Sequence, residues 1–215
     1  EVIENIAEIN RFQIGYTNKT SFLKDKIGFQ PRFTILYAGA FGKVNGLKYV
    51  IELARNLVCI DPTIVFILIG SGAEKNELIS KAKDEGVLNK NIFFLDSVST
   101  EDLTQLYREC NMGSSFVIPI KELWANSANK FFDSLAAGKP ILINYKWWQK
   151  EIINKEKIGY VLPTKINDEA VKNFATYTHD KILLQKQQKN ALNIAKESYA
   201  TNVAVAKYNH LFLNV

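Results

Sequence analysis

The stretch TILYAGAFGKVNGLKYVIELARNL, residues 34–57, decides the fold. Its first part, TILYAG (Thr34–Gly39), is a short run of apolar and β-branched residues, which predicts a buried strand. Its last part, GLKYVIELARNL (Gly46–Leu57), repeats apolar residues at helical spacing and predicts a helix with one apolar face. The next apolar run, TIVFILIG (Thr63–Gly70), shows no alternation with polar residues. Strands of this kind between helices are typical of a parallel sheet that is covered on both faces.

The alternation of strands and helices continues along the chain. Further strands are expected in residues 91–96, 114–119, 140–144 and 160–163, and helices in residues 74–86, 99–110 and 127–138. Ser99 and Asp102 have the spacing of a capping box, so Ser99 is predicted to be an N-cap. With right-handed crossovers this order gives an α/β fold, a Rossmann-like doubly wound parallel sheet of about six strands. A helical C-terminal tail is expected from about Asn167 to Leu213, with a break near Tyr199.

The two ends of the chain predict its domain organisation. Residues 1–31 have only a loose helical or irregular pattern, so we expect a lead-in that connects to an upstream domain. Residues 32–215 are expected to form one Rossmann-like domain that includes the C-terminal helices. The only methionine is Met112, so the chain has no initiator and is expected to be a piece of a longer protein.

Composition excludes several classes of protein. Of the 215 residues, 47% are hydrophobic and 23% charged, which is neither disordered nor membrane-spanning. The net charge of +5 comes from 27 basic and 22 acidic side chains without a concentrated basic stripe, so no nucleic-acid partner is expected. An anionic ligand or an acidic membrane surface stays open. Cys59 and Cys110 lack CxxC spacing and are expected to be reduced. His179 and His210 are isolated in the tail, and no metal site is expected.

In a doubly wound sheet the ligand crevice lies at the carboxyl ends of the strands, where helix N-termini offer free N–H groups to anions. The loop GAFGKVNG (Gly39–Gly46) lies at such an end, and its glycines allow tight turns and close approach of a phosphate. Its spacing is not that of a dinucleotide fingerprint, and a plain glycine-rich turn stays open. The loop IGSGAEKNEL (Ile69–Leu78) fits a ligand contact and a compact turn equally well.

The segment SANKFFDSLAAGKP (Ser127–Pro140) is more informative. Lys130 and Asp133 lie one turn apart on one face of the predicted helix. Its other face carries an apolar stripe that must face the sheet, made of Phe131, Phe132, Leu135 and Ala136. A solvent-facing ion pair worth ~0.2–0.5 kcal/mol is one interpretation. The other is a polar ligand contact, because the face begins where the crevice is expected. The basic and aromatic YKWWQK (Tyr145–Lys150) fits a membrane surface, a partner domain, a sugar, or tryptophans packed under a helix.

Taken in order, five segments resemble the C-terminal domain of a retaining GT-B glycosyltransferase. They are YAGAFGKVNGL, FILIGSGAEKNEL, NIFFLDSVSTEDL, SANKFFDSLAAGKPIL and IGYVLP, and the resemblance covers residues 16–213. It is strongest to the branch of the large family four that carries an N-K-x-F-[DE]-x-x-A-x-G-K-P signature. The family implies two Rossmann-like domains that face a cleft, of which the C-terminal one binds the nucleotide half of an activated sugar, with UDP as the expected nucleotide.

The resemblance also implies site residues. Asp133 matches the acid that grips the ribose hydroxyls, and Lys130 would neutralise the diphosphate. The rest of the diphosphate and sugar site would be Gly42, Lys43, Asn126, Ser127 and Asn129. The nucleobase edge would be read along Leu95, Asp96, Ser97 and Val98, mainly by backbone groups. Three family residues are missing, because Ala125 replaces an expected glutamate and Ala40 and Asn45 replace an arginine and a lysine.

The function implied is sugar transfer from a nucleoside-diphosphate sugar, with retention and without a metal or other cofactor. The acceptor would be a lipid-linked or polysaccharide intermediate, and the enzyme would be cytoplasmic, at the inner face of the membrane. The catalytic residues would be completed by the missing N-terminal domain, so this fragment is expected to be inactive alone. Two alternatives stay open. A non-catalytic nucleotide- or partner-binding domain fits the missing residues, and a GT-B-like sugar-nucleotide 2-epimerase would need acids and a histidine in the crevice.

Overall fold

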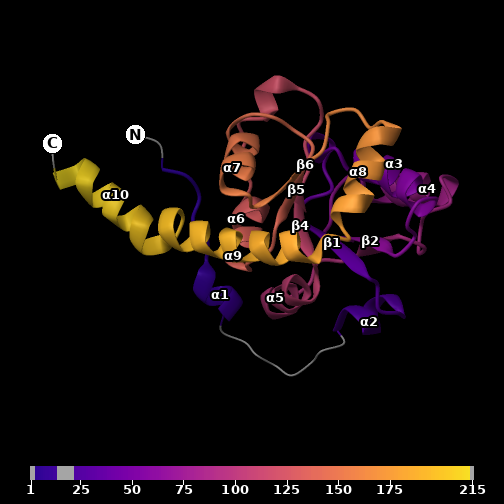
Figure 1. The fold of residues 1–215 in the computed structure, drawn as a ribbon, viewed down its shortest axis with the longest axis horizontal. Coiled ribbons are helices and arrows are strands. Elements are labelled where there is room, and N and C mark those ends of the chain that lie inside the picture. Colours follow the sequence, from indigo (N-terminus) through magenta and orange to yellow (C-terminus); the bar gives the residue numbers. More distant parts are fainter. Residues whose placement is uncertain (1–2, 14–21, 214–215) are drawn as a thin grey trace.

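A six-stranded parallel sheet forms the centre of the molecule, in the order β3-β2-β1-β4-β5-β6 (Figure 1). The computed structural model describes residues 3–13 and 22–213. The strands are β1 (Phe33–Ala38), β2 (Ile64–Ile69), β3 (Ile92–Leu95), β4 (Met112–Ser115), β5 (Ile141–Ile143) and β6 (Gly159–Val161). Every neighbouring pair is parallel. The predicted Rossmann-like α/β fold is confirmed.

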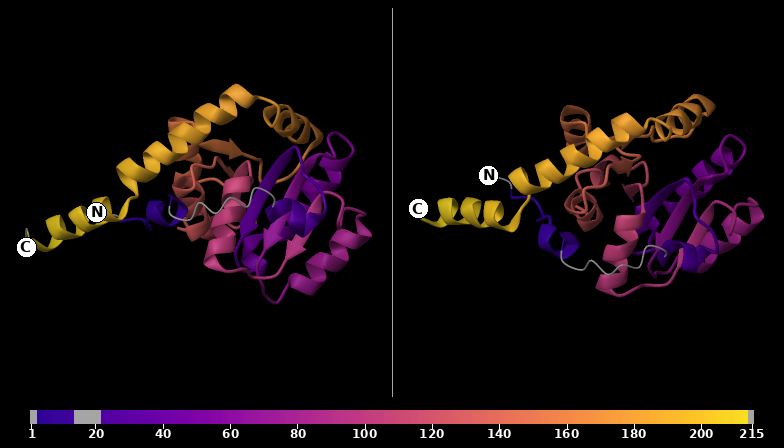
Figure 2. Two further views of the ribbon diagram at one scale, coloured as in Figure 1. Left: turned by 90° about the horizontal axis from the view of Figure 1, so that it is seen from below. Right: turned by 60° about the horizontal axis from the view of Figure 1, so that its bottom comes forward.

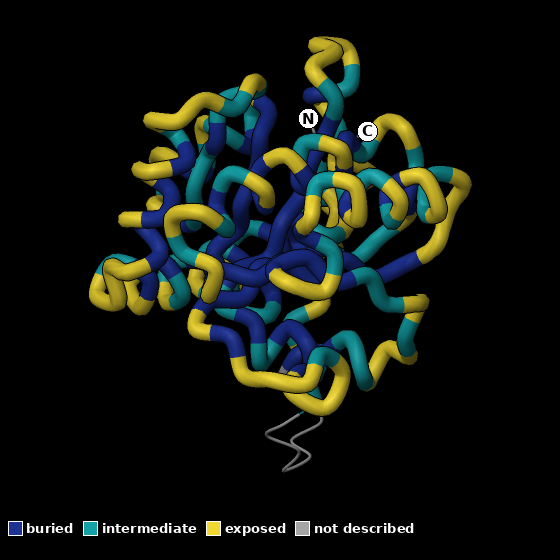
Figure 3. Tube along the Cα trace, turned by 90° about the vertical axis from the view of Figure 1, so that its right-hand side faces the viewer, coloured by how far each residue is buried: buried dark blue, intermediate teal, exposed yellow. Residues whose placement is uncertain are grey.

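Helices cover both faces of the sheet, and this is why the strands read as unbroken apolar runs. In β1, Ile35 and Tyr37 belong to one buried cluster and Leu36 to the other. One cluster lies under α3 (Leu47–Val58), α4 (Lys75–Asp84) and α8 (Asp168–Tyr177). The other lies under α5 (Thr100–Glu109), α6 (Asn129–Ala136), α7 (Trp148–Glu156) and α9 (Lys181–Ser198). The burial colours follow this layering, with the sheet dark blue and many of the loop tips yellow (Figure 3).

The ends of the chain lie beside this body. Short helices α1 (Ile9–Gln13) and α2 (Phe22–Ile27) pack against α6 and α5, so the described part of the predicted lead-in is docked on the domain. At the other end α10 (Thr201–Leu213) extends away from the body in both views of Figure 2. The helical tail is interrupted between α9 and α10, at Tyr199 and Ala200, which confirms the predicted break near Tyr199. The tail has a second break between α8 and α9 that the sequence did not predict.

Local capping agrees with the sequence in one place, and a strand boundary differs in another. The Ser99 hydroxyl accepts a hydrogen bond from the Asp102 N–H at 3.1 Å, so the predicted cap is confirmed. The strand predicted over residues 114–119 is wrong in position, because β4 ends at Ser115. Beyond it, the Asn144 side chain holds both main-chain groups of Val117, at 3.0 and 3.1 Å. The Ile118 N–H donates to the Val44 carbonyl at 3.1 Å, so the chain has left the sheet for the first loop.

Helix α6 lies close to β4 because position 113 has no side chain. A Cβ on Gly113 would lie 2.0 Å from the Ser134 Oγ and 2.8 Å from its Cβ. Ser134 is fully buried, and its hydroxyl donates to the Lys130 carbonyl one turn back at 2.7 Å. No space is left for a methyl group between this helix and the strand.

We expect Gly113→Ala to destabilise the fold by about 1–3 kcal/mol, because the added methyl must push α6 away from β4. Urea unfolding of the variant and parent measures the difference. Gly42→Ala is the matched control, since a Cβ there meets only the Asn45 Nδ2, at 3.7 Å. An unchanged midpoint for Gly113→Ala would mean that α6 can shift freely.

A polar cluster at the amino ends of the strands connects α8 to β1 and β2. The Arg32 guanidinium pairs with Asp61 at 2.5 Å and donates to the Thr178 carbonyl at 2.9 Å. The His179 Nε2 lies 2.9 Å from the same carboxylate. Burial by itself would raise the pKa of Asp61, but hydrogen bonds from Thr63 and Arg32 outweigh it and lower the pKa to about 2.

Because the folded-state pKa of Asp61 is depressed, its ionised form stabilises the fold above pH 4, and this contribution is lost as the pH falls toward 2. We expect Asp61→Asn to lower the free energy of unfolding at pH 7 by about 1 kcal/mol, after allowance for solvent screening. The difference in free energy of unfolding between the parent and the variant should be smaller at pH 3. Urea unfolding at both pH values measures this difference, with Glu197→Gln on α9 as a control. A difference that stays constant with pH would mean that the Asp61 charge does not stabilise the fold.

Candidate functional site

A cavity of about 350 Å³ lies at the carboxyl ends of the first three strands. Residues from the ends of β1, β2 and β3 and from α5 line it, namely Ala38, Gly39, Ala40, Ile69, Gly70, Ser71, Ser97, Val98 and Leu103. It therefore brings together the first predicted loop, the second predicted loop and half of the predicted nucleobase segment.

The first loop is held in place by its own side chains. The Ala40 carbonyl accepts hydrogen bonds from the Tyr37 hydroxyl at 2.8 Å and from the Asn45 Nδ2 at 2.9 Å. Asn45 therefore stabilises the loop. Gly42 precedes a single 3-10 turn, η1 (Lys43–Asn45), and Lys43 is exposed at its start. In this arrangement Lys43 is the cation that the loop offers to solvent.

The second loop is a compact turn packed against the first. Gly70 has φ 145°, and a Cβ there would lie 2.0 Å from the Gly39 carbonyl oxygen. Gly72 has φ 153°, and its Cβ would lie 2.5 Å from the Phe41 carbonyl oxygen. Glycine is needed at both positions for backbone contact between the loops. Of the two interpretations that the sequence left open, close packing explains these glycines.

The four residues of the predicted nucleobase segment differ in their surroundings. The Leu95 carbonyl accepts a hydrogen bond from the Gly70 N–H at 3.2 Å. Asp96 is exposed and pairs with Lys75, which lowers its pKa. Ser97 and Val98 line the cavity. Within the described part of the chain, their main-chain groups make no hydrogen bond, so they are free to meet a planar polar ligand.

The Lys130 side chain extends from the first turn of α6 toward the end of β1. Its Nζ is 5.2 Å from the centre of the Tyr37 ring, and its Cε would be 3.0 Å from a Cβ on Gly39. Burial lowers the pKa of Lys130, and the Asp133 carboxylate opposes part of that shift. Among the described residues it forms no ion pair within 4.0 Å. A half-buried ammonium beside a glycine loop, with no carboxylate of the described residues within 4.0 Å, is suited to bind an anion.

Asp133 lies one turn further along α6 and faces the N-terminal segment. Its side chain is 21% exposed, and one of its oxygens is 3.7 Å from the Arg11 Nη1. Burial raises the pKa of Asp133, Arg11 lowers it, and Glu8 raises it. Asp133, Asn129 and Arg11 line a second cavity, of about 390 Å³, with Asn5 and Tyr208. The carboxylate is therefore neither exposed to bulk water nor locked in a tight ion pair.

The N-terminal segment supplies residues that the sequence did not indicate. The Asn5 Nδ2 donates to the Ser127 carbonyl at 2.7 Å and to the Asn129 Oδ1 at 2.8 Å. Asn126 donates to the Leu123 carbonyl at 3.0 Å. Asn5, Glu8 and Arg11 belong to the predicted lead-in, and no periodicity or motif marked them. Their contacts with α6 exist only because the chain returns to this helix.

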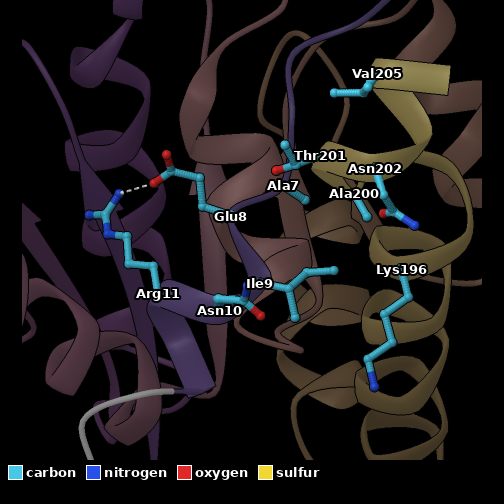
Figure 4. Close-up of a pocket in the computed structure, with 10 residues that line it drawn as sticks. All are labelled: Ala7, Glu8, Ile9, Asn10, Arg11, Lys196, Ala200, Thr201, Asn202 and Val205. Carbon is cyan, nitrogen blue, oxygen red and sulfur yellow. Dashed lines mark hydrogen bonds and ion pairs between the residues drawn. The ribbon is translucent and has the colours of Figure 1, made fainter. Parts of the chain in front are cut away.

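A wide groove of about 990 Å³ continues from Arg11 to the junction of α9 and α10 (Figure 4). In Figure 4, Glu8 and Arg11 turn toward one another on one side, and Ile9 points toward the helices that carry Lys196 and Asn202. The Ala7 N–H donates to the Tyr199 carbonyl at 2.7 Å and fixes the segment there. The groove is thus a surface between the two ends of the chain.

Two further searches concern metals and membranes. Over residues 3–13 and 22–213, no three His, Cys, Asp or Glu side chains gather in a way that could hold a metal ion. In the same ranges, no helix combines the length and apolar character needed to cross a membrane.

Comparison with known proteins places the chain in a family. Residues 19–194 match the family described as glycosyl transferases group 1. Spore coat protein SA of Bacillus subtilis (strain 168) is 23% identical over 146 residues, which are 65% of this chain and 37% of that protein. The chain therefore spans little more than a third of this relative.

Solved structures share the fold. HepE of Anabaena, crystallised with UDP, has a TM-score of 0.82 at 17% identity, over 100% of this chain and 57% of that one. The C-terminal domain of the group 1 family protein LpcC from Francisella tularensis has a TM-score of 0.68 at 19% identity. That match covers 88% of this chain and 98% of the other.

The raised pKa of Asp133 leads to a prediction about stability. Folding disfavours its ionised form, so the charge costs stability at pH 7 and costs nothing once the pH is below about 4. We expect Asp133→Asn to raise the melting temperature by about 2 °C at pH 7 and to leave it unchanged at pH 3.5. Calorimetry at both pH values measures this, with Glu52→Gln on α3 as the control. A lower melting temperature at pH 7 would mean that the pair with Arg11 outweighs burial.

Proposed function

The chain belongs to the glycosyl transferases group 1 family, and from that premise we propose that it is the nucleotide-sugar-binding half of a retaining hexosyltransferase. The donor is a nucleoside-diphosphate sugar, with UDP as the nucleotide. The base lies against Ser97 and Val98, and the ribose hydroxyls bind Asp133. The diphosphate lies between Gly42, Lys43 and Lys130, with Asn126, Ser127 and Asn129 beside the sugar.

The observation that carries this proposal is Lys130. Its ammonium is half-buried, lacks an ion pair among the described residues, and lies over Gly39 beside the first loop. A cation in this state is stabilised by an incoming diphosphate, which restores the favourable interaction that burial removed. The N-terminus of α6 adds its positive end to the same place.

The chemistry required of this half is limited. Breaking the bond between sugar and diphosphate leaves negative charge on the departing phosphate oxygen. Lys130 and Lys43 would stabilise that charge, and the loops would orient the donor. No metal is required for this role, because the cations are side chains. Retention at the anomeric carbon, and the catalytic groups that it needs, are assigned to an N-terminal domain that would close the cleft.

The acceptor is proposed to be a lipid-linked or polysaccharide intermediate. The enzyme would then work in the cytoplasm, at the inner face of the membrane. Both assignments rest only on the resemblance of the five segments to the family.

A non-catalytic nucleotide-binding domain is the second candidate. It is favoured by Ala125, which cannot replace the carboxylate of relatives, and by Asn45, whose amide is used to hold the first loop. The two candidates differ in the upstream sequence, because only an enzyme needs acceptor-side acids or a histidine there.

Calorimetric titration of the 215-residue chain with UDP, GDP and ADP tests the proposal. We expect UDP to bind best and Lys130→Ala to weaken it by about tenfold or more, as expected for loss of a charge-assisted hydrogen bond. Asp133→Ala should weaken the binding of UDP but not that of inorganic pyrophosphate, because the proposed contact of the carboxylate is with the ribose.

Lys172→Ala is the matched control, since this exposed lysine is on α8 and lines a pocket at the opposite end of the sheet. If both site variants bind UDP as well as the parent, the assignment of the donor site is wrong. Absence of UDP binding by the folded parent would favour a domain with a different ligand.

A further inference from the structure

Trp147 combines high exposure with a strained backbone. Its relative exposure is 59%, and its backbone angles are φ 97° and ψ −162°. This region of backbone space is nearly restricted to glycine, and other residues remain in it only when the surrounding structure forces them. By contrast, Lys157 has φ 53° and ψ 57°, an ordinary left-handed turn. A bulky residue at position 147 therefore needs a reason other than the turn itself.

Packing does not supply that reason. Among the described residues, the Trp147 ring makes no aromatic contact and its Nε1 donates no hydrogen bond. The other two tryptophans are explained by the fold. Trp124 is 8% exposed and donates to the Ile118 carbonyl at 3.3 Å, and the Trp148 ring lies 5.4 Å from that of Phe131.

The two residues that follow Trp147 connect its loop to α6 and to the segment before it. Trp148 packs on Phe131 in the first turn of α6, next to Lys130. Gln149 is fully buried and donates from its Nε2 to the Asn126 carbonyl. These two contacts hold the backbone after the strained residue, and before it the buried Tyr145 donates from its hydroxyl to the Ser115 Oγ at 3.2 Å.

Its place along the sheet suits the sugar end of the donor. The order of carboxyl ends is β3, β2, β1, β4 and β5, with Ser97 after β3, Lys130 beside β1 and Trp147 after β5. Adjacent strands are ~4.8 Å apart, so Trp147 lies roughly 10 Å beyond β1 along this edge. A donor with its base at β3 and its diphosphate at β1 extends its sugar toward β5.

The chemistry of the neighbourhood also fits a carbohydrate. The negative face of an indole attracts the partly positive C–H groups of a pyranose ring. Carbohydrate recognition needs an aromatic surface with a few placed polar groups.

We propose that Trp147 is a binding residue on which the pyranose ring of the donor stacks. This inference rests on the proposed function, since it places a sugar at the far end of the same nucleotide site. Trp147 is thereby a specificity-determining residue that separates a nucleotide sugar from the bare nucleotide.

The test compares Trp147→Gly with the parent in calorimetric titrations of the 215-residue chain with UDP, UDP-glucose, UDP-galactose and UDP-N-acetylglucosamine. The parent should bind at least one of the three UDP-sugars about fivefold more tightly than UDP, the factor expected of one aromatic contact. Trp147→Gly should bind UDP as the parent does and lose that preference. Its melting temperature should equal or exceed the parent's, because glycine relieves the strain.

Two variants serve as controls. Trp147→Phe keeps an aromatic ring and should keep most of the preference. Phe212→Ala removes an aromatic side chain that is 76% exposed on α10 and should change nothing. Binding to vesicles of equal parts phosphatidylcholine and phosphatidylglycerol is measured for the same proteins.

The outcomes separate the two proposals. If the parent does not bind UDP, the proposed function fails and this inference fails with it. If UDP binds but no sugar is preferred, or Trp147→Gly keeps the preference, only the role of Trp147 is wrong. A loss confined to vesicle binding would likewise overturn it and assign the ring to a membrane surface.

Discussion

The close approach of α6 to β4 is the constraint on which the site depends. Gly113 leaves no side chain between the two elements, and the Ser134 hydroxyl turns back to its own helix instead of toward the strand. The helix is therefore set at one depth and one rotation. That rotation puts Lys130 over the end of β1, Phe131 against Trp148, and Asp133 toward Arg11. Three contacts with three separate parts of the chain follow from one missing methyl group.

The two charged side chains of α6 are in surroundings that disfavour their charges. Burial disfavours the charged form of Lys130 and also that of Asp133, although the two groups have opposite charge. A pair kept for folding alone would be in direct contact, and no such contact is found between them in the part of the chain that the structure describes. Elsewhere the same protein builds a well-paired cluster, in which Arg32 and Asp61 are 2.5 Å apart and the pKa of the acid is low. The contrast between the two ends of the sheet favours a binding role for the carboxyl end.

Gly70, Gly72 and Trp147, at the carboxyl ends of the strands, differ in how their backbone conformations are explained. Gly70 and Gly72 occupy backbone conformations that suit glycine and serve close contact between two loops. Trp147 also occupies a conformation that suits glycine, and among the described residues its side chain makes no aromatic contact and no hydrogen bond. The first case is explained by packing alone, and the second is the basis of the proposed sugar contact.

The sequence by itself determined the parallel sheet, its covering helices, the Ser99 cap and the break in the tail. These depend on local periodicity and on capping groups within a few residues, which a linear pattern records. It also marked Lys130 and Asp133 as one polar face, since residues three apart on a helix are neighbours. Tertiary structure alone decided where β4 ends, because the Asn144 side chain competes for the backbone of Val117. It alone brought Asn5 and Arg11 to α6, more than a hundred residues away in sequence. Contacts of that range depend on how the chain returns to the helix, and no local propensity encodes the return.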